Sequence, residues 1–353
     1  MKIAIVTDAW RPQTNGVVTT LTRTAHCLGE LGHEVALMTP EGLPTIPCPS
    51  YPEIRLALFQ GRRVARWLEA TRPDCLHIAT EGPLGFAAHA AARRQGLRFT
   101  TSYHTQFPQY LRARYPIPEA WSYAGLRAFH GAAVRTMVGT KQMRRELRRN
   151  RMRHLVLWSR GVDTELFRPR PESPLPFPGP ILLYAGRVAV EKSIEDFCRV
   201  ERPGTKVIVG GGPALEDLKA RYPEVVFTGF KYGDELATLI AGADCFVFPS
   251  RTDTFGLVML EAMACGVPVA AYPVTGPIDV VRHGVTGCLN EDLAAAIEGA
   301  LGLDPAACRA QALEYRWENA TRQFLGNLAE ARGPAPARVR RGAFATAVHR
   351  LLG

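Results

Sequence analysis

Two pairs of charged residues in the second half of this chain could bind a charged ligand rich in hydroxyl groups. Asp253 precedes an apolar run, residues 255–264, and Glu261 is the only ionisable group inside that run. A helix that is apolar on all sides is buried, and a buried carboxylate is costly without hydrogen-bond partners. Ligand hydroxyls would provide such partners. The alternative is that a backbone amide or a nearby arginine satisfies Glu261.

Arg187 and Lys192 form the second pair, directly after the apolar run Ile181–Ala185. Ligands of open α/β sheets bind beyond the carboxyl ends of the strands. A guanidinium fork and an ammonium point charge at such an edge would suit a diphosphate. Because the chain has six lysines against 37 arginines, a lysine is not its default cation. A solvated surface pair is the alternative.

These residues resemble the motifs of the retaining, nucleotide-sugar-dependent glycosyltransferases of the GT-B fold, in the large family that includes bacterial mannosyltransferases and glycolipid synthases. That family carries Gly-Arg, a Lys five residues later, and two acidic residues separated by seven others. The corresponding residues here are Gly186, Arg187, Lys192, Asp253 and Glu261. The family commonly has Glu where this chain has Asp253, which reaches one methylene less far and could also act as a helix N-cap.

The resemblance extends over roughly residues 1–330, with the motifs in the family's order. The further similar segments are Ile3–Asp8 with Pro12–Gly16, Ser102–Phe107, Ser159–Asp163 with Phe167–Pro169, Gly210–Pro213 and His283–Gly287. The implied fold is α/β, with two Rossmann-like parallel-sheet domains facing each other across a deep cleft, which is the default ligand site.

The resemblance also assigns roles to residues of the donor site. The implied catalytic residues are His104, Arg187, Lys192 and Asp253. The implied donor-binding residues are Gly16, Gly186, Arg187, Lys192, Gly256, Leu257, Val258 and Glu261. Cations and helix-terminal amides would stabilise charge on the departing diphosphate. Glu261 would bind the ribose hydroxyls.

Two further roles concern the donor sugar, and both belong to the resemblance. Asp253 would bind the sugar's hydroxyls, and His104 would lie near its reacting carbon, although His104 could instead be a loop histidine with satisfied bonds. Gly16 would let the backbone approach the ligand closely, unless it is part of an ordinary tight turn.

Short apolar runs alternate with longer helical patterns throughout the chain. The runs are Ile3–Thr7, Val35–Thr39, Cys75–Ala79, Phe99–Tyr103, Val134–Val138, Leu155–Trp158, Ile181–Ala185, Val207–Val209, Val225–Thr228, Cys245–Phe248 and Val267–Tyr272. This alternation predicts parallel sheets with crossover helices, and 353 residues suffice for two domains.

Prolines and composition suggest where the domains divide. We expect a first domain over residues 1–168, a Pro-rich linker over 169–180 and a nucleotide-sugar-binding domain over 181–311. A helix over 312–333, within which Ala312–Ala331 is the helical pattern, would cross back to the first domain, followed by a basic and flexible tail over 334–353.

Charge is uneven: basic residues outnumber acidic ones over 1–175, and the reverse holds over 176–331. The basic half predicts an anionic partner, with an anionic membrane surface favoured over nucleic acid, for which no motif is present. The candidate acceptor or membrane residues are Phe107, Tyr110, Arg112, Arg144 and Arg148. A solvated helix face is the alternative for the segment 141–153.

The expected reaction is transfer of a hexose from a nucleoside-diphosphate sugar, with a UDP-sugar favoured and GDP-mannose possible, to an acceptor hydroxyl such as that of diacylglycerol. The nucleotide-sugar is a co-substrate, and no cofactor is expected. No metal is expected either, because the chain has no Asp-x-Asp pair, the usual metal-diphosphate ligand motif of the other major glycosyltransferase fold. Scattered cysteines and the absence of an apolar leader or spanning segment predict a cytoplasmic protein, peripheral at the inner membrane face. The alternatives are an epimerase or phosphorylase on the same fold, and a basic membrane- or nucleic-acid-binding scaffold.

Overall fold

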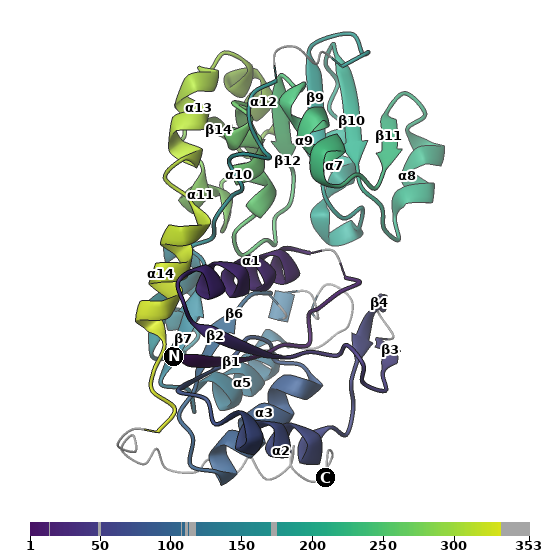
Figure 1. Ribbon diagram of the computed structural model, residues 1–353. Coiled ribbons are helices and arrows are strands. Elements are labelled where there is room, and N and C mark those ends of the chain that lie inside the picture. The colour runs from purple at the N-terminus through teal and green to yellow at the C-terminus, as the bar shows by residue number, and fades with distance from the viewer. Residues whose placement is uncertain are drawn as a thin grey trace. The chain divides into compact units, whose positions relative to one another are not determined.

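The computed structural model of the protein describes residues 1–13, 15–48, 51–106, 108–109, 112, 118–170 and 175–332. These residues form two compact units. One contains Met1–Ser159 and the described residues from Ala320 onward, and the other contains Arg160–Asn319. Each unit is built on a six-stranded parallel sheet between helices (Figure 1).

The first unit has the strand order β2-β1-β5-β6-β7-β8. The strands are β1 (Lys2–Val6), β2 (Glu34–Met38), β5 (Cys75–Ile78), β6 (Thr100–Tyr103), β7 (Arg135–Val138) and β8 (Leu155–Leu157). An antiparallel hairpin, β3 (Ile46–Cys48) with β4 (Tyr51–Leu56), lies outside this sheet.

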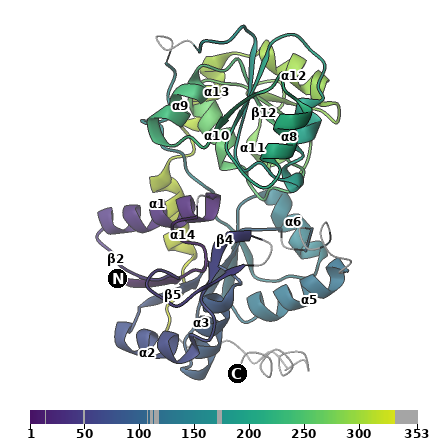
Figure 2. The ribbon, with the colours of Figure 1, turned by 90° about the vertical axis from the view of Figure 1, so that its right-hand side faces the viewer.

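Helices cover both faces of the first sheet, because side chains alternate along its strands. Ile3 and Ile5 of β1 pack with helices α1 (Gly16–Glu30) and α14 (Trp317–Asn327). The residues between and after them, Ala4 and Val6, pack on the opposite face with α2, α3 and α5. These helices span Gly61–Thr71, Pro83–Arg94 and Glu119–His130, and α6 spans Lys141–Arg149 (Figure 2).

The second unit has the order β11-β10-β9-β12-β13-β14, which is the doubly wound order 3-2-1-4-5-6. Its strands are β9 (Ile181–Ala185), β10 (Thr205–Val209), β11 (Val226–Gly229), β12 (Cys245–Phe248), β13 (Val269–Ala271) and β14 (Gly287–Leu289). Strands β10 and β11 are added on one side of β9, and β12, β13 and β14 on the other side. Ligands of such sheets bind at the reversal point between β9 and β12, where the direction of strand addition changes.

Two apolar layers sandwich the second sheet. Ile181, Leu183 and Ala185 of β9 face α9 (Gly233–Ala241), α10 (Leu257–Ala264) and α13 (Pro305–Ala312). Leu182 and Tyr184 face α7, α8 and α12 on the other side. The remaining helices are η1 (Val190–Lys192), α7 (Ile194–Cys198), α8 (Leu215–Arg221), α11 (Pro277–Val280) and α12 (Leu293–Leu301).

The eleven apolar runs in the sequence correspond to strands, with ends that differ by at most two residues. Three strands, β3, β4 and β14, are additional to the prediction. The predicted helix Ala312–Ala331 was wrong at both ends, because Ala312 ends α13 and α14 runs only from Trp317 to Asn327.

All eight cysteines are free thiols, as the scattered positions predicted. Six of them are buried, namely Cys27, Cys75, Cys198, Cys245, Cys265 and Cys308. Burial raises the pKa of Cys198 to about 11 and those of Cys265 and Cys308 to about 12. Such thiols carry little thiolate near neutral pH, so they are chemically inert while the fold is closed.

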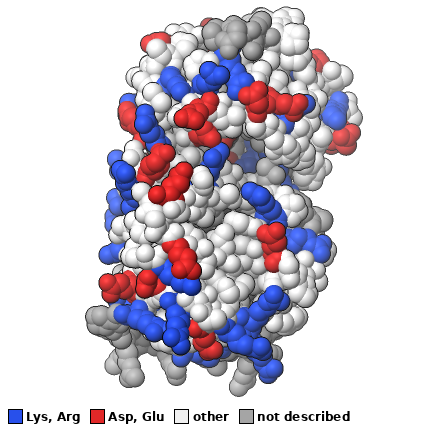
Figure 3. All heavy atoms as spheres, viewed as in Figure 1, with Lys and Arg blue, Asp and Glu red and all other residues white. Residues whose placement is uncertain are grey.

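Basic side chains gather at the end of the first unit that carries α2 and α3 (Figure 3). Arg62, Arg63 and Arg66 of α2 are exposed, and so are Arg93 and Arg94 in the last turn of α3. Glu69 is the one acidic residue in these two helices.

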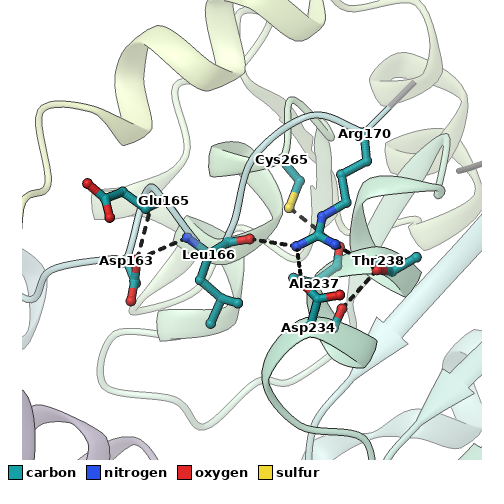
Figure 4. Close-up of polar contacts among 8 residues, drawn as sticks. All are labelled: Asp163, Glu165, Leu166, Arg170, Asp234, Ala237, Thr238 and Cys265. Carbon is teal, nitrogen blue, oxygen red and sulfur yellow. Dashed lines mark hydrogen bonds and ion pairs between the residues drawn. The ribbon is translucent and has the colours of Figure 1, made fainter. Parts of the chain in front are cut away.

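The boundary between the units lies between Ser159 and Arg160, earlier in the chain than the predicted position at 168. Figure 4 shows the segment around Arg170, whose guanidinium donates to Asp234 Oδ1 at 2.7 Å and to Thr238 Oγ1 at 2.9 Å. A second guanidinium, Arg309, donates to the carbonyl oxygen of Phe167 at 2.7 Å. The described part of the Pro-rich segment thus belongs to the second unit.

Candidate active site

The candidate site lies at the carboxyl edge of the second sheet, where β9 and β12 run side by side. The loop after β9 carries Gly186, Arg187 and Lys192, and the loop after β12 carries Asp253. Thr252 Oγ1 donates to the carbonyl oxygen of Glu191 at 3.0 Å and joins the two loops. The sequence motifs therefore meet at the reversal point of the sheet.

Lys192 and Asp253 form a direct ion pair. The Lys192 Nζ atom is 2.7 Å from both Asp253 Oδ1 and Oδ2. Both side chains are largely covered, with exposed fractions of 18% and 20%. The sequence predicted separate roles for these residues, whereas the structure pairs them, so an incoming anion would share the ammonium with this carboxylate. Arg187 is half-buried on the same loop.

Glycines bring the backbone of neighbouring loops close to this site. Gly186 has φ of +151°, and a Cβ on it would lie 2.8 Å from the Tyr184 hydroxyl oxygen, which itself donates to the carbonyl oxygen of Arg187. Gly210 has φ of +135°, and its Cβ would lie 1.9 Å from the Gly186 carbonyl oxygen. Only glycine fits such positions.

Gly276, after β13, is a neighbour of the site that the sequence motifs did not identify. A Cβ on it would lie 3.1 Å from the Asp253 carbonyl oxygen, and its φ is +98°. The signal that could have revealed it is the Gly276-Pro277 step in the loop after an apolar strand.

Helix α10 presents its N-terminus at the same edge. Gly256 is the N-cap, with φ of +83°, and no side chain caps the helix. The interpretation of Asp253 as an N-cap was therefore wrong, because the chain turns into the helix three residues later. With no side-chain cap, the first-turn amides of Gly256, Leu257 and Val258 are available to bind an anion.

Glu261 lies one turn into α10, between Leu260 and Ala262, which are buried. Its own side chain is half-buried rather than fully enclosed, as the sequence had suggested. Its carboxylate has no hydrogen bond or ion pair among the described residues. Burial raises the pKa of this carboxyl to about 7. The alternative that protein groups satisfy Glu261 is not supported there, and such a carboxyl is typical of a ligand site.

His104 follows β6 in the first unit and is buried. Its Nε2 lies 2.8 Å from Ser102 Oγ, which also lies 3.0 Å from His77 Nε2 and donates to the Ala79 carbonyl oxygen at 3.3 Å. A hydroxyl has one proton, so when Ser102 donates to Ala79 both imidazoles must donate through Nε2. Ser102 begins one of the segments similar to the family, but the sequence assigned it no role. His77 was not identified, because a histidine inside a strand carries no motif.

The remaining predicted residues lie elsewhere in the first unit. Gly16 is exposed and begins α1, whose N-cap Asn15 accepts from the amides of Val17 and Val18 through Oδ1. Gly16 is therefore helical rather than part of a tight turn. Its closeness to a ligand stays a prediction.

The predicted acceptor or membrane residues are only partly described. Phe107 and Tyr110 lie outside the described residues. Arg112 is exposed and donates to Glu119 Oε1 at 3.1 Å. In α6, Arg148 is exposed and Arg144 half-buried, while Met143 and Leu147 pack inward.

Other features of the described residues point to no second site of this kind. A hollow of about 400 Å³ in the second unit, lined by Pro180, Asp244, Pro268 and others, lies at the opposite, amino edge of β9 and β12. Within the described ranges no three His, Cys, Asp or Glu side chains cluster as metal ligands would. No described helix is long and apolar enough to cross a bilayer.

The fold and this edge define a doubly wound α/β protein with cations, carboxyls and helix amides gathered at one sheet edge. Comparisons with known proteins name the class. Residues 179–303 match the family model of "Glycosyl transferases group 1", and residues 14–166 match that of "Glycosyltransferase Family 4".

Two relatives are similar over much of the chain. The GDP-mannose-dependent alpha-mannosyltransferase of Mycobacterium tuberculosis is 31% identical over 82% of this chain and 83% of its own length. The sulfoquinovosyl transferase SQD2 of Arabidopsis thaliana is 34% identical over 74% of this chain, which spans 58% of that relative.

Solved structures share the fold at low identity. Sucrose-phosphate synthase from Thermosynechococcus elongatus matches with a TM-score of 0.73 and 22% identity, over 92% of this chain and 97% of its own. Anabaena Alr3699/HepE in complex with UDP and glucose matches with a TM-score of 0.68 and 17% identity, over 92% and 98%. The chain belongs to the glycosyltransferase family with the GT-B fold, as the sequence predicted.

Proposed function

We propose that the protein transfers a hexosyl group from a nucleoside-diphosphate sugar to an acceptor hydroxyl, with retention of anomeric configuration and without a metal ion. The observation that carries the proposal is the set of groups at one sheet edge: the Lys192–Asp253 pair, the uncapped N-terminus of α10 and the unpartnered Glu261 carboxyl. Cations and amides suit a diphosphate, and a lone carboxyl suits vicinal hydroxyls.

In this proposal the protein's groups act on charge that develops as the diphosphate departs. Arg187, Lys192 and the first-turn amides of α10 would stabilise the leaving oxygens, which makes a divalent cation unnecessary. Glu261 would accept hydrogen bonds from the ribose hydroxyls, and Asp253 from the sugar. The leaving phosphate would take the acceptor's proton, and His104 would contact the donor sugar.

Two donor classes are compatible with this site. We favour a UDP-sugar, as the sequence analysis did, and in support of it a solved structure with the same fold, Anabaena Alr3699/HepE, is in complex with UDP. The GDP-mannose-dependent relative, of which the match covers 83%, supports a GDP-sugar instead. Measured binding of UDP and GDP therefore decides which nucleotide the donor carries.

The acceptor we propose is a lipid hydroxyl at an anionic membrane surface, which the protein reaches as a peripheral protein from the cytoplasm. The excess of basic residues over residues 1–175 supports this. One relative, SQD2, is named as a transferase of a sulfoquinovosyl group.

The test is thermal stabilisation of the purified chain by UDP and by GDP, in the presence of a chelator. A ligand that binds the folded state raises the unfolding temperature with its concentration. A shift with one nucleotide that is lost in Glu261→Gln and kept in Glu318→Gln, an exposed carboxyl of α14, would support the site and name the donor. No shift with either nucleotide at millimolar concentration would refute it.

Catalysis is tested by release of free nucleoside diphosphate with diacylglycerol in anionic vesicles. Release that depends on the acceptor separates transfer from epimerisation, and release without inorganic phosphate excludes a phosphorylase. A scaffold would tolerate Arg187→Ala and Lys192→Ala, whereas a transferase would lose turnover.

A further inference from the structure

An exposed aromatic ring stands at the entry to α2, beside the basic residues at that end of the first unit. Phe59 is 84% exposed. Its backbone has φ of +57°, in the left-handed region that a non-glycine residue adopts at a cost. Phe59 therefore combines a large apolar side chain in water with an unfavourable backbone conformation, and neither feature stabilises the fold.

Helix α2 itself is amphipathic, with a basic outer face. Val64 and Leu68 are buried against the core, and Arg62, Arg63 and Arg66 are exposed on the opposite side. None of the three arginines forms an ion pair with an acidic side chain in the described part of the chain.

Two of these arginines also oppose the helix dipole. Arg62 and Arg63 lie in the first turn of α2, which contains no acidic residue. Cations are unfavourable at this end of a helix, so the positions of these side chains do not serve the helix. They are suited to an anionic surface outside the protein.

The same surface continues onto α3, which packs against α2 (Figure 2). Arg93 and Arg94 are exposed in the last turn of α3. We define the α2–α3 basic face as Phe59 with Arg62, Arg63, Arg66, Arg93 and Arg94. It contrasts with α6, which is also basic but carries no exposed aromatic residue of its own.

We propose that the α2–α3 basic face docks the protein on an anionic lipid bilayer, with the Phe59 ring inserted among the acyl chains and the arginines among the headgroups. An aromatic wedge beside cations is the composition that binds membrane interfaces, and each cation near an anionic surface adds to the attraction. This proposal rests on the membrane association in the proposed function, and it names the surface that makes the contact.

The experiment is flotation of the purified full chain with vesicles of phosphatidylglycerol and phosphatidylcholine at low salt. We expect the triple variant Arg62→Gln, Arg63→Gln, Arg66→Gln to bind roughly a hundredfold more weakly than the wild type. The charge-matched control removes Lys141, Arg145 and Arg149, three exposed cations of α6, as glutamines. Equal losses in the two triple variants would overturn the proposal, since net charge alone would then explain binding.

A second pair of variants tests the ring. We expect Phe59→Ser to weaken vesicle binding about tenfold, while Trp121→Ser, which removes an equally large ring exposed by 73% on α5, leaves binding near the wild-type value. Quenching of an indole placed by Phe59→Trp by brominated lipids would show insertion directly, and absence of quenching would contradict it.

Two controls separate this proposal from others. Thermal stabilisation by UDP or GDP should be the same in all variants as in the wild type, so that loss of flotation with intact nucleotide binding supports the surface, whatever the donor is. Loss of RNA binding in the α2 triple variant, with no wild-type flotation, would show that the face binds nucleic acid instead and would refute the lipid proposal.

Discussion

Replacing Glu261 by glutamine should make the free protein more stable at alkaline pH while weakening nucleotide binding. The carboxyl has an ordinary pKa of 4.5 and a pKa of about 7 in the folded protein, because burial disfavours its charged form. A raised carboxyl pKa means that the folded state holds the proton more tightly than the unfolded state. The penalty is therefore absent below pH 4.5, grows as pH rises, and is complete above pH 7.

The size of the effect follows from the shift. A difference of this size corresponds to about 3 kcal/mol at pH 8. This is an upper value, because the side chain is only half-buried and is partly screened by water, and because the glutamine amide also needs hydrogen-bond partners. The unfolding temperatures of wild type and Glu261→Gln should therefore coincide near pH 4.5 and separate by several degrees at pH 8, with the variant the more stable. Glu318→Gln, at an exposed carboxyl, should show no such divergence.

Nucleotide binding should change in the opposite direction. A hydrogen bond to a charged group contributes roughly 1.5–3 kcal/mol, so the variant should bind its nucleotide about ten- to a hundredfold more weakly at pH 8. Calorimetric titration at pH 6 and pH 8 measures this, with weaker wild-type binding expected at pH 6. A constant temperature difference across the pH range would refute the buried-carboxyl reasoning, and unchanged affinity would refute the ribose role.

Three further predictions concern other groups of the site. Lys192→Ala should reduce acceptor-dependent nucleotide release by about a hundredfold or more, and near-normal turnover would show that the ammonium does not meet the diphosphate. Gly186→Ala should destabilise the protein by about 1–3 kcal/mol, because the φ of Gly186 is +151° and a Cβ there would crowd a tyrosine hydroxyl. Gly302→Ala should not destabilise it, because the space around Gly302 is open. Thermal melts of the two variants test this difference. Ser102→Ala should change the ¹⁵N tautomer signature of His104, and Ser102→Thr should restore it; identical spectra in all three proteins would show that the hydroxyl does not set the tautomer.

Much of the fold could be predicted because apolar runs are a strong signal for buried parallel strands. Ile181–Ala185 is apolar on both faces of its sheet, and its pattern allows little else. The hairpin of β3 and β4 escaped prediction because prolines interrupt it, as at Pro47. Strand β14 has only three residues, and one of them is a glycine, so its local pattern is too short to stand out.

The candidate site was predictable in its residues but not in its contacts. The spacing of Asp253 and Glu261 identifies both carboxyls, yet sequence does not reveal that one is paired with Lys192 and the other has no partner among the described residues. These differences depend on loops that are distant in sequence and meet at one sheet edge. The same holds for Ser102 and His77, whose bonds depend on strand register.

The buried cysteines can report the rate at which each unit opens. Cys27 and Cys75 belong to the first unit, and Cys198, Cys245, Cys265 and Cys308 belong to the second. Because the fold must open before such thiols ionise and react, the rate at which each is alkylated measures the opening of its own surroundings. Pulsed alkylation followed by peptide mass spectrometry would thus follow the two units separately in one sample, without any engineered cysteine. A nucleotide held by the second unit should slow only the second set.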